Sequence, residues 1–338
     1  MKISVDAGAL CLGENLRFGN YYFSKNLLEA IQRYDKVNEY FIYSFCEKPI
    51  WLTENEKLNY KILRPKMLWL STRVSLEEIR QKKDIFLALN QAIPISTSGQ
   101  VVSFSHGLSF YFYPQFYQDS YYSLKDQLKP MVKKSRYIVV SSLRVKTELR
   151  KLFPQYKNFV VINYGVPFDM LEEKSNVRKK YFLSVGMNNS IKNIEFLLKV
   201  FKKFRNKNRF SEYKLFLVGN LNSFEDKNNN IFSYSSINRE QLRKLYAEAT
   251  AYLTTSYYES FNFPVLEALS QNCTVLGLKG AIIPEFREFV SLAYDSDDFL
   301  EQMKDIVLGG KAKVRRSDVM NRFSWKKYIL KLKELYEV

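Results

Sequence analysis

Short apolar runs alternate with longer amphipathic segments along most of the 338 residues. The apolar runs have the length of buried strands, and the segments between them repeat apolar residues at helical spacing. This alternation predicts an α/β fold with parallel sheets, because strand, helix and parallel strand form its repeating unit. The expected strands lie at residues 2–6, 40–45, 84–89, 101–104, 137–140, 159–163, 181–186, 214–219, 251–254 and 274–278.

Both halves of the chain repeat this alternation, so two Rossmann-like domains are expected. Their predicted extents are 1–167 for an N-terminal domain, 168–180 for a linker and 181–322 for a C-terminal domain. Residues 323–338 place six apolar side chains on one face of a last helix. Further helices are predicted over 24–33, 143–152, from about 193, around 237–248, from Pro264 and over 295–308, with Ser141 or Ser142 capping the second.

Residues 245–288 carry the first functional argument. They predict a helix end, a strand, a polar turn and a new helix opening at Pro264. Glu259 precedes this helix and Glu267 lies one turn inside it. The backbone N–H groups at its start can hold an anion such as phosphate, and carboxylates accept hydrogen bonds from hydroxyls. The pattern fits a nucleotide sugar, although Glu267 could merely complement the helix dipole and Glu259 could be a solvated loop residue.

Three more positions are candidates for a ligand site. Gly19 lies in a glycine-containing loop between the first strand and helix, where backbone can approach phosphates, although a plain turn is the more common explanation of such a loop. Lys192 stands before a helix in the second half, where an ammonium suits a diphosphate but is also typical of a protein surface. His106, the only histidine, follows the strand at 101–104, and a lone histidine is commonly structural.

Composition limits the class of protein. Lys and Arg number 52 against 35 Asp and Glu, a net charge of +17, which favours an anionic partner such as a phosphorylated substrate, nucleic acid or anionic lipid. Cys11, Cys46 and Cys273 are far apart and suggest neither a disulfide nor a zinc site, which fits a reducing cytoplasm. The N-terminus does not read as a signal peptide, and no apolar run reaches bilayer length.

Aromatic and basic residues follow one another after His106. Residues 110–122 are rich in Phe and Tyr, which can stack on a sugar, sit at a membrane interface or simply pack on the domain. Lys125, Lys129 and Lys133 recur every four residues, so a basic helical face is expected, with Pro130 kinking the helix. This face favours contact with anionic lipid, although a solvated surface is the ordinary explanation.

The stretch ESFNFPVLEAL, with Glu259 and Glu267 eight positions apart, resembles the E-x7-E signature of retaining GT-B glycosyltransferases of family 4. The resemblance covers nearly the whole chain, firmly from Tyr181 to Phe286. It implies two Rossmann-like domains facing across a cleft, with the C-terminal helix returning to the N-terminal domain. It further implies hexose transfer, mannose- or glucose-like, from a nucleotide diphosphate sugar to a glycan or lipid-linked acceptor in cell-surface polysaccharide synthesis.

The resemblance also assigns roles. Gly19, Lys192 and the helix start at Asn262, Phe263, Pro264, Val265 and Leu266 would hold the donor diphosphate. Glu267 would bind ribose, while Glu259 and His106 would orient the hexose. No protein nucleophile, cofactor or metal is implied, and the enzyme would be cytoplasmic, at the inner face of the membrane.

The sequence departs from the family pattern at Met187, where the family has Arg, at Gly107, where Asp is common, and at Ser260 and Asn262, where Gly is frequent. A catalytically silent GT-B subunit that docks on membrane or on an active partner is therefore the alternative. Nucleotide-sugar epimerisation is another function of the same fold class. Nucleic-acid binding rests on net charge alone and is not expected.

Overall fold

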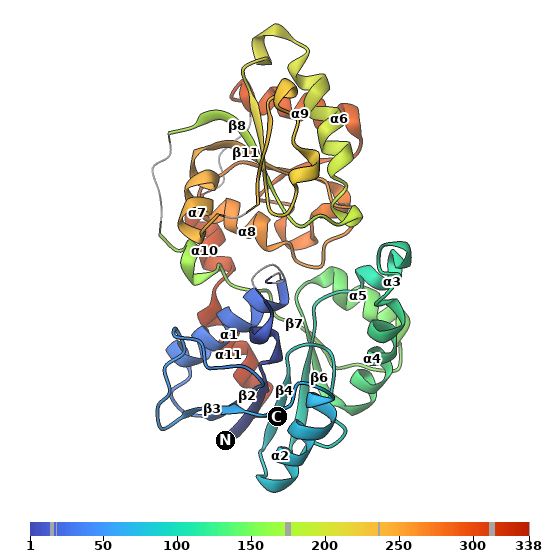
Figure 1. Cartoon of the computed structure of the whole chain (residues 1–338), viewed down its shortest axis with the longest axis vertical. Helices are drawn as coiled ribbons and strands as arrows, with labels where there is room; N and C mark the ends of the chain where they lie inside the picture. The colour runs from blue at the N-terminus through green and yellow to red at the C-terminus, as the bar shows by residue number, and fades with distance from the viewer. Residues whose placement is uncertain (14–16, 18, 173–176, 236, 311–314, 338) are drawn as a thin grey trace. The chain divides into compact units, whose positions relative to one another are not determined.

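The computed structural model describes residues 1–13, 17, 19–172, 177–235, 237–310 and 315–337. The chain divides into two compact units, each built on its own sheet (Figure 1). Unit 1 comprises Met1–Gly165 with Ser324–Val338, and unit 2 comprises Val166–Phe323. The chain therefore passes from one unit to the other twice. Residues 173–176 of the expected linker lie outside the described residues.

Unit 1 contains a seven-stranded sheet in the order β3-β2-β1-β4-β5-β6-β7, and neighbouring strands pair in parallel. The order steps outward from β1 in both directions, so the connecting helices cover both faces. Its central strands are largely buried on both faces, and β4 is apolar throughout for this reason. The strands are β1 Lys2–Asp6, β2 Glu39–Ser44, β3 Leu58–Ile62, β4 Ile85–Ala88, β5 Gln100–Ser105, β6 Ser135–Val140 and β7 Phe159–Val161.

The last helix of the chain, α11, packs within unit 1. Trp325 and Tyr328 are buried against Phe23 of α1, with ring centroids 6.2 Å apart in both pairs. The apolar face that the sequence predicts for this helix is thus the face that it buries. The described helices of unit 1 are η1 Gly8–Cys11, α1 Gly19–Tyr34, η3 Leu70–Val74, α2 Ser75–Arg80, α3 Ser109–Phe112, η4 Pro114–Phe116, α4 Tyr121–Lys134, α5 Leu143–Leu152 and α11 Trp325–Glu334.

Unit 2 contains a six-stranded sheet in the order β10-β9-β8-β11-β12-β13, again parallel. The helices α6 and α9 lie on one side of it and α7 and α8 on the other (Figure 1). The strands are β8 Lys179–Val185, β9 Lys214–Val218, β10 Ile231–Tyr234, β11 Ala249–Thr254, β12 Val275–Leu278 and β13 Ser291–Ala293. The longer helices are α6 Ile194–Arg205, α7 Arg239–Glu248, α8 Phe263–Ser270, α9 Ser296–Val307 and α10 Arg316–Arg322.

The apolar spacing of α6 predicts its buried face well. Ile194, Leu197, Phe201 and Phe204 are at most 6% exposed and pack into one core with strand residues such as Leu215. The predicted helix over 143–152 is also confirmed, and Ser142 is its cap, since its hydroxyl accepts the N–H of Val145. The pattern missed the short strands β3, β10 and β13, because three to five residues give little periodicity.

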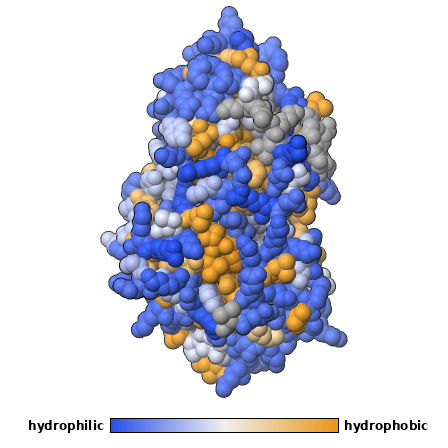
Figure 2. Space-filling model, turned by 180° about the vertical axis from the view of Figure 1, so that it is seen from behind, coloured by the Kyte–Doolittle hydropathy of each residue, from blue (hydrophilic) through white to orange (hydrophobic). Residues whose placement is uncertain are grey.

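Hydrophilic residues cover most of the face drawn in Figure 2, and hydrophobic residues gather in patches between them. In the described parts of the chain, no helix combines the length and the apolar character needed to cross a bilayer.

Candidate functional site

Lys192 and Glu259 meet at the carboxyl ends of two neighbouring strands of unit 2. β8 ends at Val185 and β11 at Thr254, and these strands pair directly in the sheet. Lys192 Nζ lies 2.6 Å from Glu259 Oε1, and the Ser256 hydroxyl donates to the same oxygen at 2.7 Å. The two charged side chains are 20% and 13% exposed, so their ion pair is partly shielded but still accessible.

Backbone contacts fix the two loops that carry this pair. The Thr255 hydroxyl donates to the carbonyl oxygens of Lys192 and Asn193, at 3.1 Å each. The backbone N–H of Tyr257 donates to the carbonyl of Ile191 at 2.9 Å. The ion pair therefore joins loops that are already tied together, which lowers the entropy that the two side chains lose on pairing.

Gly186, which follows β8, lies between Gly219 and the side chain of Lys192. Gly219 has φ +123°, and a Cβ on it would lie 1.8 Å from the carbonyl oxygen of Gly186. A Cβ on Gly186 would lie 3.6 Å from Cδ of Lys192, so the lysine side chain passes over this glycine. Met187 follows directly, and Lys192 is the one basic residue in the sequence 186–193.

Asn262 replaces a glycine of the family pattern and adopts a glycine-like conformation. Its φ of 72° lies in the left-handed region, where Asn is tolerated better than most residues. Its side-chain amide donates to the Thr254 hydroxyl at 3.3 Å and to the carbonyl of Ala281 at 3.2 Å. The side chain is thereby held inside unit 2.

The group of backbone donors predicted at the start of α8 is smaller than expected. Pro264 has no N–H, and the N–H of Val265 donates to the carbonyl of Asn262 at 3.1 Å, because the left-handed Asn262 closes a turn there. These two positions cannot offer free N–H groups to an anion, which corrects the prediction. Phe263 and Leu266 stay predicted donors.

Glu267 is 4% exposed, and each of its oxygens accepts a bond inside unit 2. Arg239 Nη2 donates to Oε1 at 2.6 Å, and the Tyr246 hydroxyl donates to Oε2 at 3.1 Å. Burial raises the pKa of Tyr246 well above its usual value, and the Glu267 carboxylate raises it further, so this hydroxyl keeps its proton. Arg239 also binds both oxygens of Asp169, at 2.9 and 3.0 Å.

Asp169 belongs to a segment, residues 168–172, that packs on α7 and α8. The buried Met170 offers its carbonyl to the side-chain amide of Gln271 at 2.8 Å, and Arg243 donates to the carbonyl of Asp169 at 3.1 Å. Sequence reasoning missed Arg239, Asp169 and Tyr246. Arg239 and Asp169 stand 70 positions apart, and neither lies in a motif that points to the other.

His106 in unit 1 has both ring nitrogens bonded within the protein. Nε2 lies 2.6 Å from the carbonyl of Leu89 and so carries the proton, since a carbonyl can only accept. Nδ1 then accepts from the Tyr164 hydroxyl at 2.8 Å. Burial lowers the pKa of His106 to about 4, against the opposing effect of the Leu89 bond, so the ring is neutral near neutral pH. Gly107 follows with φ +122°, which disfavours the Asp of the family pattern.

Gly19 begins α1 and is exposed. No atom of the described residues other than its chain neighbours and its own helix lies within 4 Å of the position that a Cβ would take. Packing within unit 1 therefore does not require glycine here. Its predicted role, close approach of a ligand to the backbone, stays a prediction.

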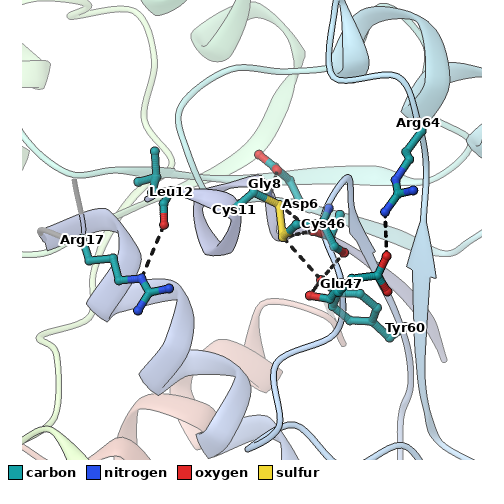
Figure 3. The surroundings of a disulfide bond; sticks show 10 residues. Asp6, Gly8, Cys11, Leu12, Arg17, Cys46, Glu47, Tyr60 and Arg64 are labelled. Atoms are coloured by element: carbon teal, nitrogen blue, oxygen red, sulfur yellow. Dashed lines mark hydrogen bonds and ion pairs between the residues drawn. A yellow bond between two sulfur atoms is a disulfide. The ribbon is translucent and has the colours of Figure 1, made fainter. Parts of the chain in front are cut away.

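Cys11 and Cys46 form a disulfide (Figure 3), which corrects the expectation that the cysteines are unpaired. They stand 35 positions apart, but their Cα atoms are 5.5 Å apart because Cys11 follows β1 and Cys46 follows the neighbouring β2. The expectation of a reducing compartment loses this support. Cys273 is a free, buried cysteine, and burial raises the pKa of its thiol to about 11.

Asp6 lies at the carboxyl end of β1, beside this disulfide (Figure 3). Its carboxylate accepts the backbone N–H of Gly8 at 3.0 Å and the side-chain amide of Asn90 at 3.4 Å. Burial raises the pKa of Asp6 to about 6, although both hydrogen bonds oppose the shift.

Solved structures share this architecture over nearly their whole length. Sucrose-phosphate synthase from Thermosynechococcus elongatus has a TM-score of 0.75 at 15% identity, covering 99% of this chain and 98% of that one. The Anabaena protein HepE, solved with UDP and glucose, has a TM-score of 0.73 at 14% identity, covering 100% and 99%. WaaG, a glycosyltransferase involved in lipopolysaccharide biosynthesis, has a TM-score of 0.66 at 13% identity, covering 96% and 93%.

These likenesses confirm the expected fold, that of the GT-B glycosyltransferases. Residues 167–316 match the family model for glycosyl transferases group 1. They make up nearly all of unit 2, so this unit is similar to a group 1 glycosyltransferase domain. No curated protein matches the sequence. The fold is thus that of the GT-B glycosyltransferases, and the similarity to the group 1 family model lies in unit 2.

Proposed function

We propose that the protein transfers a hexose, mannose- or glucose-like, from a nucleotide diphosphate sugar to a glycan or lipid-linked acceptor, with retention at the anomeric carbon as in family 4. The observation that carries the proposal is the ion pair of Lys192 and Glu259 at the carboxyl ends of β8 and β11, within a unit similar to a group 1 glycosyltransferase domain. The UDP and glucose in HepE and the lipopolysaccharide role of WaaG support a hexose and a cell-surface product.

Lys192 binds the β-phosphate of the donor in this proposal. An ammonium has three N–H bonds, and the contact with Glu259 uses one of them. The other two can reach phosphate oxygens, with each charge-assisted bond contributing about 1.5–3 kcal/mol. Glu259 accepts hydrogen bonds from hexose hydroxyls, which a carboxylate does better than any neutral side chain.

Glu267 recognises ribose. Arg239 and Tyr246 hold its two oxygens in place, and each oxygen has a further lone pair for a ribose hydroxyl. The backbone N–H groups of Phe263 and Leu266 add to diphosphate binding.

Gly19 and His106 are the contributions of unit 1. Gly19 lets the backbone of the loop approach the diphosphate, and His106 orients the hexose. Since both nitrogens of His106 are bonded inside unit 1, a hydrogen bond to the sugar requires the bond to Tyr164 or to Leu89 to open.

The reaction breaks the bond between the anomeric carbon and the β-phosphate oxygen, whose electron pair stays on the departing nucleoside diphosphate. The acceptor oxygen bonds to the same face of that carbon, and its proton passes to the departing phosphate. Negative charge therefore develops at the phosphate beside Lys192, where a positioned cation lowers the barrier. No protein nucleophile, metal or cofactor is part of the proposal.

The acceptor side of the proposal is a membrane. We place the enzyme at the cytoplasmic face of the membrane as a peripheral protein, supported by the net charge of +17.

The test is thermal stabilisation by GDP- and UDP-sugars, repeated with Lys192→Ala and Glu259→Ala. A ligand at a hundred times its Kd stabilises the folded state by about 2.7 kcal/mol. At least one sugar nucleotide should stabilise the wild type, and both variants should lose most of the effect. Lys199→Ala, on the exposed side of α6, is the matched control. Stabilisation that survives in both variants, or none in the wild type, would refute the proposal.

The alternative of a catalytically silent subunit rested on Met187 and on Ser260 and Asn262 in place of glycine. Asn262 weakens this alternative. Its backbone adopts the conformation of a glycine, and its side chain points into unit 2 rather than into the start of α8. Because Met187 carries no charge, Lys192 is the cation of the loop that follows β8. Product formation with turnover, rather than binding alone, distinguishes the two functions.

A further inference from the structure

The helical segment η3–α2 of unit 1 turns its acids inward and its aliphatic side chains outward. Leu76 and Ile79 are 38% and 63% exposed, whereas Glu77 and Glu78 are 6% and 0% exposed. A helix on the surface of a soluble protein normally has the opposite arrangement, with aliphatic residues on the core and carboxylates in water. The exposure of Leu76 and Ile79 therefore indicates contact with a partner outside this chain.

The inward position of the acids is built into unit 1. Glu78 accepts from the Tyr43 hydroxyl at 3.0 Å and from the Ser98 hydroxyl at 3.2 Å. Glu77 forms an ion pair with Lys61, 2.5 Å apart. Since these bonds satisfy buried carboxylates, rotating the helix to bury Leu76 and Ile79 would leave charges unpaired, and the outward aliphatic face is fixed.

Basic residues surround this aliphatic face. Arg73 and Arg80 are exposed and stand three and four positions from Leu76, so all three lie on the outer face of the same helical segment. Over residues 66–82 the two acids are the buried Glu77 and Glu78. The exposed residues of this stretch that are aliphatic or basic are Lys66, Met67, Leu68, Arg73, Leu76, Ile79, Arg80 and Lys82.

We infer that residues 66–82 form a docking surface for an anionic lipid bilayer, in which the aliphatic side chains enter the headgroup layer and the basic ones bind lipid phosphates. This inference deepens the membrane part of the proposed function. The mixture of aliphatic and basic side chains without an exposed acid fits a bilayer better than nucleic acid, which offers no apolar layer. On α4 the lysines accompany one large exposed apolar side chain, Tyr122, so that helix gives charge with little to insert.

The test is sedimentation with vesicles of equal parts phosphatidylglycerol and phosphatidylcholine, compared with phosphatidylcholine alone. Arg73→Gln/Arg80→Gln should weaken binding to the anionic vesicles about twenty-five-fold, at about five-fold for each basic residue. Leu76→Ser/Ile79→Ser should abolish the binding that resists added salt, since salt screens the charges and leaves the apolar part. Lys129→Gln/Lys133→Gln on α4 removes the same charge elsewhere and should change binding less than five-fold.

Equal losses in the α4 control and in the Arg73/Arg80 variant would overturn the inference, as would failure of the wild type to prefer anionic vesicles. Every altered side chain is exposed, so the variants should keep the wild-type thermal midpoint. Stabilisation by sugar nucleotides is measured on the same variants and should stay unchanged. A failure of lipid docking is thus separable from a failure of the proposed transferase function.

Discussion

Asp6 and His106 should make the stability of unit 1 depend on pH in opposite directions. In the wild type these two effects should cancel. The pKa of Asp6 is raised from 3.8 to about 6, so the folded unit holds this proton more tightly than the unfolded chain. Its stabilisation is full below about pH 4 and is lost as the pH rises through about 6. The pKa of His106 is lowered from 6.5 to about 4, so its stabilisation is full above about pH 6.5 and is lost as the pH falls.

The two magnitudes are similar. Each pKa unit corresponds to about 1.4 kcal/mol, so each group changes the free energy of unfolding by about 3 kcal/mol between about pH 4 and pH 7. In the wild type these changes have opposite signs. Asp6→Asn leaves the His106 contribution, so this variant should lose about 3 kcal/mol as the pH falls over that range. His106→Gln leaves the Asp6 contribution and should gain about 3 kcal/mol over the same fall.

The assay is urea unfolding followed by tryptophan fluorescence at several pH values. All three tryptophans of the chain, Trp51, Trp69 and Trp325, belong to unit 1, so the signal reports on this unit. Every other titrating group contributes equally to both variants, and the difference between them isolates the two residues. The reasoning is refuted if the two variants show parallel dependences on pH. His106→Asn serves as a second variant if Gln prevents folding.

Three further predictions concern bonds of unit 2 and the cysteines. Arg239→Gln should destabilise unit 2 by about 3–5 kcal/mol in urea unfolding, because it leaves the buried Glu267 without its cation; a loss below about 1 kcal/mol would contradict this. Gly219→Ala should destabilise unit 2 by at least about 2 kcal/mol, since the Cβ meets the carbonyl of Gly186 at positive φ, and a neutral result would show that the loop can shift. Thiol titration in denaturant should label Cys273 alone before reduction and three cysteines afterwards; three labelled cysteines without reductant would refute the disulfide.

The sequence predicted the parallel sheets because their strands are buried on both faces and stand out as apolar runs. It also predicted that Lys192 and Glu259 belong to one site, since both follow strands whose carboxyl ends meet at one sheet edge. Contacts that depend on tertiary packing could not be predicted from the sequence. Arg239 and Asp169 carry no shared motif, and the spacing of Cys11 and Cys46 does not identify them as partners.

The segment η3–α2 shows where periodicity itself misleads. Its sequence, read as a helix, would place Leu76 and Ile79 on the core and Glu77 and Glu78 in water. The hydroxyls of Tyr43 and Ser98 reverse this preference by offering Glu78 hydrogen bonds inside unit 1. These donors lie 35 and 20 positions away in the sequence, so no pattern within the segment indicates them.

The two candidate site carboxylates of unit 2, Glu259 and Glu267, are held in different ways. The difference suits the roles proposed for them. Glu267 is almost fully buried between Arg239 and Tyr246, so its geometry is set before any ligand arrives, as recognition of an invariant ribose requires. Glu259 shares a more exposed ion pair with Lys192. In the proposed reaction, a donor phosphate that competes for the ammonium of Lys192 would weaken its hold on Glu259 and free a carboxylate oxygen for a hexose hydroxyl. The proposal therefore couples binding of the diphosphate to orientation of the sugar through this ion pair.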